Sequence, residues 1–326
     1  KWLYEIKPTI NISILNEEVF IMSCYYGHLE VAKWLYQVKP TIDISTDNEH
    51  AFRISCKNGH LDVAKWLYEI KPTIDISANN EFAFKFSCSN GHLDLAKWLY
   101  EINPTIDISA NNEYAFRWSC NSSHLEVAKW LYEIKPTIDI SAENEYTFKY
   151  SCYNGHLNVA KWLYEIKPTI NISANNEYAF RWSCSSGHLD VVKWLYEIKP
   201  TINISADDEC AFRFSCSSGH LDVVKWLYEI KPTIDIINII NIINITNLTN
   251  QTIIQWLITI NPNITYKNVN GIYILCKRIN TIKKENIVFT DNCCVCLEEA
   301  DCLTECNHQM CLDCVDRLEK HICPLC

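Results

Sequence analysis

The sequence lacks an excess of basic residues. Its 326 residues include 29 Lys and Arg against 39 Asp and Glu, which gives a formal net charge of -10 at pH 7. Binding to a phosphate backbone depends on a surplus of Lys and Arg. We therefore expect no nucleic-acid partner.

A long apolar run is also missing. No stretch of about 18 or more uncharged apolar residues occurs, and the most apolar segment, IINIINIINIT from Ile236, is interrupted by Asn at every third residue. The sequence begins KWLY, in the middle of a recurring phrase, and no secretory signal pattern is visible. These features predict no membrane-spanning segment.

The 18 cysteines do not form a disulfide pattern, because of how they are distributed. Nine crowd into residues 293–326, and seven recur singly every 32 residues: Cys24, Cys56, Cys88, Cys120, Cys152, Cys184 and Cys216. Stacked helices lie roughly 8–10 Å apart, beyond the roughly 7 Å that a disulfide spans between Cα atoms. The periodic cysteines are thus expected to be reduced core residues of a cytoplasmic protein, with a nuclear location left open.

An internal repeat organises most of the chain. KWLY recurs at Lys1, Lys33, Lys65, Lys97, Lys129, Lys161, Lys193 and Lys225. This fixed period predicts a solenoid, in which units that cannot bury their apolar faces alone stack on one another. Seven complete units span roughly residues 16–236, after a partial unit at the start.

Each unit is predicted to be a helix hairpin followed by a connector. In NNEYAFRWSCSSGHLDVVKWLYEIKPTINIS, Asn175 is expected to cap a first helix that stops at Gly187. A second helix follows from about His188, with its apolar residues on one stripe. Pro200 ends that helix, and TINIS alternates like a short extended connector.

The unit resembles the ankyrin repeat. The resemblance lies in the turn GHL, in VVKWL on the second helix, and in the pair SC where ankyrin repeats usually carry two alanines. The Thr-Pro-Leu-His opening of that family is replaced by YAFR, and its Gly-Ala-Asp stretch by KPTI. The resemblance implies an all-α repeat solenoid. The abundant Ile, Asn, Lys and Tyr, with near-copied repeats, resemble the ankyrin arrays of giant amoebal viruses.

Two positions of the unit, counted from residue 16 and from every 32nd residue after it, vary among its copies. The third reads Glu18, His50, Phe82, Tyr114, Tyr146, Tyr178 and Cys210, and the seventh reads Met22, Ile54, Phe86, Trp118, Tyr150, Trp182 and Phe214. In ankyrin-like stacks the first helices line the concave face, so Tyr114, Tyr146 and Tyr178 are candidates for binding a protein substrate. The alternative, which we favour at the seventh position, is that these aromatics form the core between repeats.

The sixth position of the unit is basic: Arg53, Lys85, Arg117, Lys149, Arg181 and Arg213. This ladder is a second candidate surface, for an acidic partner. A glutamate precedes each cation by four residues, so ordinary helix-surface ion pairs are the favoured interpretation. The histidine of each GHL turn lacks a partner at metal-ligand spacing, which favours a structural role.

The repeat decays beyond residue 236. Residues 237–284 combine an Asn/Ile low-complexity stretch with IIQWLITINPNIT, an echo of VVKWLYEIKPTID. We expect a degenerate terminal repeat that covers the end of the solenoid. Residues 285–292 are then a linker to a cysteine-rich domain at 293–326.

Residues 293–326 contain four pairs of zinc-type ligands. The pairs are Cys293 with Cys296, Cys306 with His308, Cys311 with Cys314, and Cys323 with Cys326. Two such pairs enclose one tetrahedral ion and leave no open position, so the set predicts two structural Zn2+ ions. In so short a segment the metal must supply much of the folding energy.

The order of three cysteines, one histidine and four cysteines resembles the RING finger, a small α+β zinc domain. The resemblance assigns Cys293, Cys296, Cys311 and Cys314 to one ion, and Cys306, His308, Cys323 and Cys326 to the other. Cys294 and Cys302 are left over.

RING fingers typically dock a ubiquitin-conjugating enzyme and orient its ubiquitin towards a substrate, without a covalent intermediate. The resemblance implies that Val295, Leu318 and Pro324 form the docking groove. Leu318 replaces the common Trp, and the basic residue that follows the eighth ligand in that family has no counterpart here. The sequence thus predicts a ubiquitin ligase whose array recruits a protein. The alternative is a non-enzymatic adaptor with a purely structural zinc domain.

Overall fold

The computed structural model describes residues 16–234, 236, 251–261, 264–269, 272–277, 281–283, 302–304 and 309–310. The chain divides into two compact units, Lys1–Ala174 and Asn175–Cys326. Each unit is described by itself below.

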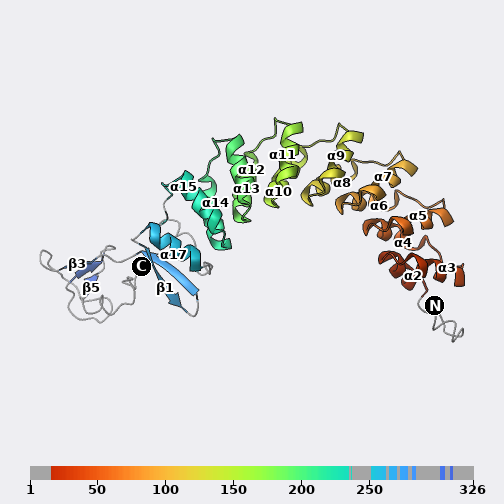
Figure 1. The fold of residues 1–326 in the computed structure, drawn as a ribbon, viewed down its shortest axis with the longest axis horizontal. Helices are drawn as coiled ribbons and strands as arrows, with labels where there is room; N and C mark the ends of the chain where they lie inside the picture. Colours follow the sequence, from red (N-terminus) through yellow and green to blue (C-terminus); the bar gives the residue numbers. More distant parts are fainter. Residues whose placement is uncertain are drawn as a thin grey trace. The chain divides into compact units, whose positions relative to one another are not determined.

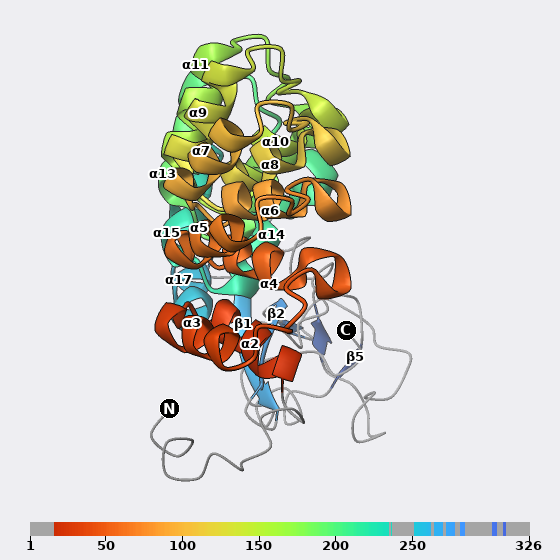
Figure 2. The same cartoon turned by 90° about the vertical axis from the view of Figure 1, so that its right-hand side faces the viewer.

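The described part of the first unit contains five helix hairpins (Figure 1). Their first helices are α2 (Asn16–Tyr25), α4 (Thr46–Lys57), α6 (Ala78–Ser89), α8 (Ala110–Asn121) and α10 (Ala142–Tyr153). Their second helices are α3 (Leu29–Val38), α5 (Leu61–Ile70), α7 (Leu93–Ile102), α9 (Leu125–Ile134) and α11 (Leu157–Ile166). The first helices contact one another in chain order, and Figure 2 shows the second helices as a separate layer beside them. The predicted solenoid of helix hairpins is confirmed.

The second unit continues the same pattern and ends differently. It contains α12 (Ala174–Ser185), α13 (Leu189–Ile198), α14 (Ala206–Ser218), α15 (Leu221–Ile230) and α17 (Gln251–Ile260). Its strands are β1 (Ile264–Val269), β2 (Ile272–Lys277), β3 (Thr281–Lys283), β4 (Cys302–Thr304) and β5 (Gln309–Met310).

The same positions of each repeat are buried in the core. In each hairpin the fifth residue of the unit is a fully buried Phe, from Phe20 to Phe212, and the ninth is a buried Cys. Burying a side chain of this size stabilises the fold by roughly 1.5–3 kcal/mol. All periodic cysteines are free and buried, as predicted. Burial raises the pKa of the Cys24 thiol to about 12, so this sulfur packs as an apolar group.

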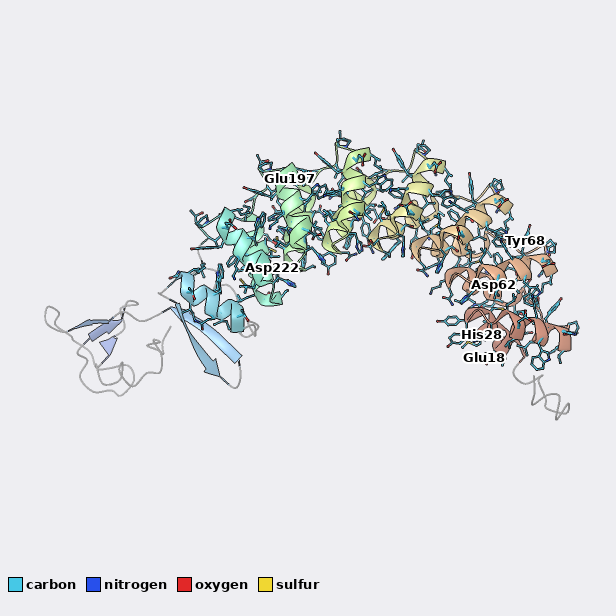
Figure 3. The ribbon with its side chains drawn as sticks, in the orientation of Figure 1. Glu18, His28, Asp62, Tyr68, Glu197 and Asp222 are labelled. Carbon is cyan, nitrogen blue, oxygen red and sulfur yellow. The ribbon has the colours of Figure 1, made fainter. Side chains whose placement is uncertain are left out.

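The second helices pack through a Tyr–Trp contact between successive repeats. Tyr68, labelled in Figure 3, meets Trp98 edge to face with ring centroids 5.9 Å apart. The same contact joins Tyr228 of α15 to Trp256 of α17 at 5.6 Å. The echo at residues 251–260 therefore packs as the second helix of a further repeat.

The connector between repeats differs from the prediction. It forms two successive turns rather than an extended segment, closed in one copy by Ile74 N–H donating to Lys71 O and Ala78 N–H donating to Asp75 O. The expected alternation survives, because Ile74 and Ile76 are buried at 5% and 7% exposure. The turns occur because Pro72 cannot continue the helix before it.

Two small antiparallel sheets follow α17, and the first of them lies where a degenerate helical repeat was expected. In the first, β1 pairs with β2 so that Val269 lies opposite Ile272. In the second, β3 pairs with β4, and β4 with β5. β3 lies in the predicted terminal repeat of residues 237–284, and β4 and β5 lie in the predicted cysteine-rich domain of residues 293–326.

Candidate functional site

A left-handed turn lies near the start of each described first helix from α4 onward. In α8, Asn111, Asn112 and Glu113 have φ angles of 58°, 56° and 58°. Left-handed backbone costs an L-residue roughly 1–2 kcal/mol, with Asn and Asp the most tolerant. Asn175, which we expected to be a helix cap, is the first residue of the equivalent turn in α12. These turns therefore need compensation from the side chains around them.

The basic residue at the sixth position supplies this compensation. Arg117 Nε donates to Asn112 O at 2.6 Å and Arg117 Nη2 donates to Asn111 O at 3.2 Å. Its Nη1 donates to Glu143 of the next repeat at 2.9 Å. The guanidinium thus satisfies two carbonyls of its own turn and ties that turn to the following one.

Other copies repeat this Arg clamp. Arg53 donates to Asn48 O at 2.6 Å and to Asp47 O at 2.8 Å. Arg181 and Arg213 make the equivalent pairs of bonds in α12 and α14. Of the six predicted surface cations, five are buried at 4–8% exposure: Arg53, Lys85, Arg117, Lys149 and Arg181. The basic ladder is therefore internal, which corrects its interpretation as an open surface for an acidic partner.

The glutamate of the turn also has an internal role. Ser109 Oγ donates to Glu113 Oε1 at 2.7 Å, and Asp107 N–H, in the connector that follows α7, donates to Glu81 Oε1 of the same repeat at 3.3 Å. Where the sixth residue is Lys85 or Lys149, the pKa of the amine is lowered, because the effect of burial exceeds the opposing effect of the glutamate four residues earlier. The arginines instead donate to the turn carbonyls. These bonds replace the ion pairs that we expected between each arginine and the glutamate four residues earlier.

The third and seventh positions form a band of aromatic rings. We define the aromatic ribbon as Phe82, Phe86, Tyr114, Trp118, Tyr146 and Tyr150, on α6, α8 and α10. Centroids lie 4.3 Å apart for Phe82 and Phe86, 5.6 Å for Phe86 and Tyr114, and 5.7 Å for Tyr114 and Trp118. All six rings are partly exposed. Seventh-position rings thus contact the rings of neighbouring repeats, as Phe86 does with Tyr114, but they are partly exposed rather than fully buried.

The buried cations lie beneath this ribbon. The Arg117 guanidinium carbon is 5.1 Å from the Tyr146 ring centroid, and the Lys85 amine is 5.6 Å from that of Tyr114. Such contacts stabilise by about 0.5–2 kcal/mol and fix the plane of the ring. The exposed faces are thus held in position before any partner arrives. Tyr178, the third predicted aromatic, pairs with Trp182 at 5.8 Å in the second unit.

The turn inside each hairpin joins successive repeats. His60 Nε2–H donates to Tyr25 O of the preceding repeat at 2.9 Å, and Asn58 Nδ2 donates to the same carbonyl at 2.8 Å. Gly27 has a φ of +70°, and a Cβ built there would lie 2.4 Å from His60 Nδ1. The histidine has the structural role that the sequence favours, and the glycine makes room for it.

Ankyrin repeats are the family that this geometry matches. A family model for ankyrin repeats in three copies matches residues 84–176 and 148–238, and one for ankyrin repeats in many copies matches residues 18–68. Together these matches cover more than half of the chain. The chain belongs to the ankyrin-repeat family. A search of the curated proteins finds no match.

Ankyrin repeats are a protein–protein interaction domain, which assigns the array to binding a protein. Among the described helices of the ankyrin array and beyond, none combines the length and apolar character needed to cross a membrane. The aromatic ribbon is a partly exposed band of rings on the first helices, and it contains two of the three predicted aromatic candidates. It is therefore the candidate binding surface of the array.

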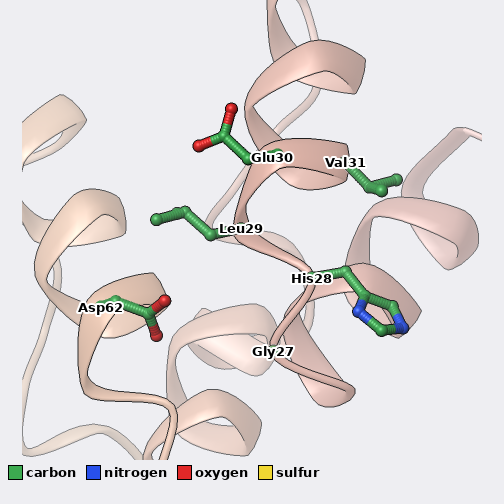
Figure 4. A pocket seen from close by; sticks show the side chains of 6 residues that line it. All are labelled: Gly27, His28, Leu29, Glu30, Val31 and Asp62. Carbon is green, nitrogen blue, oxygen red and sulfur yellow. The ribbon is translucent and has the colours of Figure 1, made fainter.

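A pocket at the start of the array offers no catalytic arrangement. Its lining consists of Gly27, His28, Leu29, Glu30, Val31 and Asp62. Figure 4 shows the His28 ring pointing away from the Glu30 and Asp62 carboxylates. The described residues also contain no group of three or more His, Cys, Asp or Glu side chains that could hold a metal ion.

The predicted zinc ligands and docking residues lie outside the described residues. The ligands concerned are Cys293, Cys296, Cys306, His308, Cys311, Cys314, Cys323 and Cys326, and the docking residues are Val295, Leu318 and Pro324. Nearby, β4 and β5 pair with Cys302 opposite Met310 and Leu303 opposite Gln309. In the sequence, Cys306 and His308 lie between these two strands, and Cys311 directly follows the second.

Proposed function

We propose that the protein is a RING-type ubiquitin ligase in which the ankyrin array recruits a protein substrate. The observation that carries the proposal is the set of eight zinc-type ligands in residues 293–326. One Cys-x-x-Cys pair is common, whereas four ligand pairs in this order are specific to few folds. The resemblance to viral arrays makes a host protein the expected substrate.

The strand pairing supports this proposal at the level of the backbone. In the sequence, Cys306 and His308 lie between β4 and β5, and Cys311 directly follows β5. The RING assignment gives Cys306 and His308 to one ion and Cys311 to the other, which is the alternation along the chain that two interleaved sites need. The donor set of thiolates and one imidazole fits Zn2+, which would supply folding energy rather than chemistry.

Zinc content tests the ligand assignment. We expect about two Zn2+ ions per chain, with loss of metal in Cys293→Ser because three ligands do not close a structural site. Cys294→Ser and Cys302→Ser are matched controls, since both cysteines are left over from the assignment. Metal measured by atomic emission would contradict the assignment if the controls lose as much zinc as Cys293→Ser.

Ubiquitin chain formation tests the ligase activity. The purified chain, incubated with ubiquitin, activating enzyme and a panel of conjugating enzymes, is expected to form ubiquitin chains. Val295→Ala or Leu318→Ala should lower the rate by roughly 10-fold or more while both zinc ions stay bound. A chain that holds two zinc ions and forms no ubiquitin conjugates with any enzyme of the panel would instead be the non-enzymatic adaptor.

A further inference from the structure

The junction between the first helices α8 and α10 departs from the other repeats at two positions of the sequence. Ser123 occupies the place at which the other described hairpin turns have a left-handed glycine. Thr147 occupies a place at which five first helices have alanine: Ala51, Ala83, Ala115, Ala179 and Ala211. Val19, the remaining exception at the alanine position, lies in α2, which has no earlier first helix among the described residues.

Thr147 enlarges the face of α10 that packs against α8. It lies one helical turn before Ser151, whose Oγ is bonded to Cys120 O of α8, so the two side chains share one face of the helix. Thr147 is fully buried, and within the described part of the chain its hydroxyl has no hydrogen-bond partner. Compared with alanine, threonine adds a methyl group that needs space and a hydroxyl that gains no bond.

The serine bond that links successive first helices is longer at this junction. Ser151 Oγ lies 3.5 Å from Cys120 O. The equivalent distances at the α4–α6, α6–α8 and α12–α14 junctions are 3.1, 3.0 and 2.9 Å. A hydroxyl donor normally lies within about 3.0 Å of its acceptor. The bond between α8 and α10 is therefore weak, in agreement with the larger side chain of Thr147 beside it.

The aromatic ribbon is interrupted at the same junction. Phe86 on α6 and Tyr114 on α8 have ring centroids 5.6 Å apart, and Tyr146 and Tyr150 lie 4.2 Å apart within α10. Among the described side chains, no ring of α8 contacts a ring of α10, and the gap is spanned by the Arg117 guanidinium, 5.1 Å from the Tyr146 centroid. The ribbon thus has two facets, one on α6 and α8 and the other on α10.

Ser123 affects the turn at one end of this junction. A Cβ built on Gly91 would lie 2.5 Å from His124 Nδ1, which is closer than real Cβ atoms approach. Ser123 has a Cβ at the equivalent place, so the His156 ring cannot pack on this turn as closely as His124 packs on Gly91. His156 Nε2–H still donates to Asn121 O at 2.9 Å.

The second helices keep their ordinary contact at the same junction. Tyr132 of α9 and Trp162 of α11 have ring centroids 6.0 Å apart. Tyr100 and Trp130, one repeat earlier, have the same separation. The looser packing is therefore confined to the first helices.

We propose that the α8–α10 junction is a hinge of the array, at which the first helices move apart and together while the second helices α9 and α11 stay in contact. A loosened layer beside a firm one permits rotation about the firm layer. The links from Arg117 to Glu143 and from His156 to Asn121 are made by side chains, which can follow a small rotation. The hinge belongs to the array, whether or not the cysteine-rich segment is a ligase.

The hinge has a consequence for partner binding. The two facets of the aromatic ribbon lie on opposite sides of the α8–α10 junction. A partner that contacts both facets must favour one angle between them, so its affinity depends on how freely the junction moves.

Distances between spin labels on the full chain test this proposal. Labels are attached to a ketone-bearing phenylalanine analogue, because labelling at cysteine is not selective in a chain with 18 cysteines. The pair at Phe82 and Tyr146 spans the α6–α8 and α8–α10 junctions, and the control pair at His50 and Tyr114 spans α4–α6 and α6–α8. We expect the distance distribution from double electron–electron resonance to be about two-fold broader for Phe82 and Tyr146.

Two double variants complete the test. Ser123→Gly with Thr147→Ala gives the α8–α10 junction the residues of the other junctions, and it should narrow the Phe82–Tyr146 distribution to the width of the control pair. Gly59→Ser with Ala83→Thr introduces both substitutions at α4–α6, and it should broaden the distribution of the control pair while that of Phe82 and Tyr146 is unchanged.

Two results would overturn the hinge. One is an equal width for the two label pairs in the chain without these substitutions. The other is a Phe82–Tyr146 distribution that stays broad when Ser123 and Thr147 are replaced. Neither result depends on ubiquitin chain formation, so the hinge and the ligase activity can fail separately.

Discussion

The repeats from α4 onward use left-handed backbone in two places, and the two are secured differently. Near the start of the first helix, three consecutive left-handed residues are held in four repeats by an arginine of the same repeat, as in Arg117 with Asn111 and Asn112. Between the two helices, one left-handed glycine is covered by the histidine of the next repeat, as in Gly59 with His92. The arginine contact lies mostly within one repeat, whereas the glycine–histidine contact forms only when the next repeat is stacked on the first. Damage to the first should therefore weaken one repeat, and damage to the second should weaken an interface.

The largest expected effect comes from removing an Arg clamp. Arg117→Met leaves two turn carbonyls and Glu143 without their charged donor, and we expect a loss of about 3 kcal/mol in the free energy of unfolding. Arg213→Met is the matched control, because Arg213 binds the same two carbonyls in its own repeat but is not buried. Urea unfolding of both variants should show the larger loss for Arg117, and equal losses would contradict an added contribution from burial and the link to Glu143.

The glycine turn should respond to a single methyl group. In Gly59→Ala the new Cβ lies 2.5 Å from His92 Nδ1, and the residue must keep a φ of +79°. We expect a loss of about 2 kcal/mol, combining backbone strain with a displaced histidine. The variant His92→Ala with Gly59→Ala separates the two causes, since it removes the clash and retains the strain. Thermal unfolding of the double variant should show less than the sum of the two single losses.

One repeat already has a residue other than glycine at the left-handed position of this turn. Ser123 occupies the position of the turn glycine, with a φ of 66°. Ser123→Gly should raise the free energy of unfolding by about 0.5–1 kcal/mol, because the strain of a left-handed L-residue is removed. Ser122→Gly, one residue earlier, is the control and should not stabilise the fold. A melting temperature unchanged by Ser123→Gly would show that this turn is not strained.

Acid should loosen the histidine contacts, and this is the smallest effect. Burial lowers the pKa of His92, the bond to Lys57 O raises it, and a charged His60 lowers it further. The unfolded chain therefore binds protons first as the pH falls below about 6.5, so the free energy of unfolding decreases there and levels off below the folded pKa. His92→Gln should reduce this dependence by a few tenths of a kcal/mol between pH 7.5 and 5.5. His28→Gln, at an exposed turn with no earlier repeat among the described residues, is the control.

The sequence predicts the hairpins well because their determinants are local. The apolar stripe of the second helix, the turn glycine and the periodic cysteines each depend on a few residues within one repeat. The left-handed turns were missed because Asn-Asn-Glu before an apolar helix is also the pattern of a helix cap. Arg117 was predicted to form a surface ion pair because a glutamate lies four residues earlier in the sequence. In the fold, its guanidinium donates instead to carbonyls of the left-handed turn.

A usable signal existed for one of the missed elements. The strands β1 and β2 are separated by Asn270 and Gly271, the dipeptide most typical of a two-residue hairpin. The exposure of the seventh-position rings had no such signal. Large aromatics at helical spacing are equally compatible with a core, and only the arrangement of neighbouring helices decides which face remains open.

The serine that precedes a buried cysteine forms the same hydrogen bonds in several repeats, which makes those repeats structurally equivalent. Ser87 Oγ donates both to Ala83 O of its own helix at 2.7 Å and to Cys56 O of the preceding repeat at 3.1 Å, and Ser119 does the same with Ala115 O and Cys88 O. Ser215 Oγ bonds Cys184 O in the same way at 2.9 Å, so these three junctions present the same acceptor to the same donor. Removing residues 78–109 as a block would bring Ser119 to face Cys56 O across a junction of the usual kind. A gene encoding such a chain can gain or lose whole repeats while each new neighbour still fits, so the length of the binding surface is free to change without any new contact having to evolve.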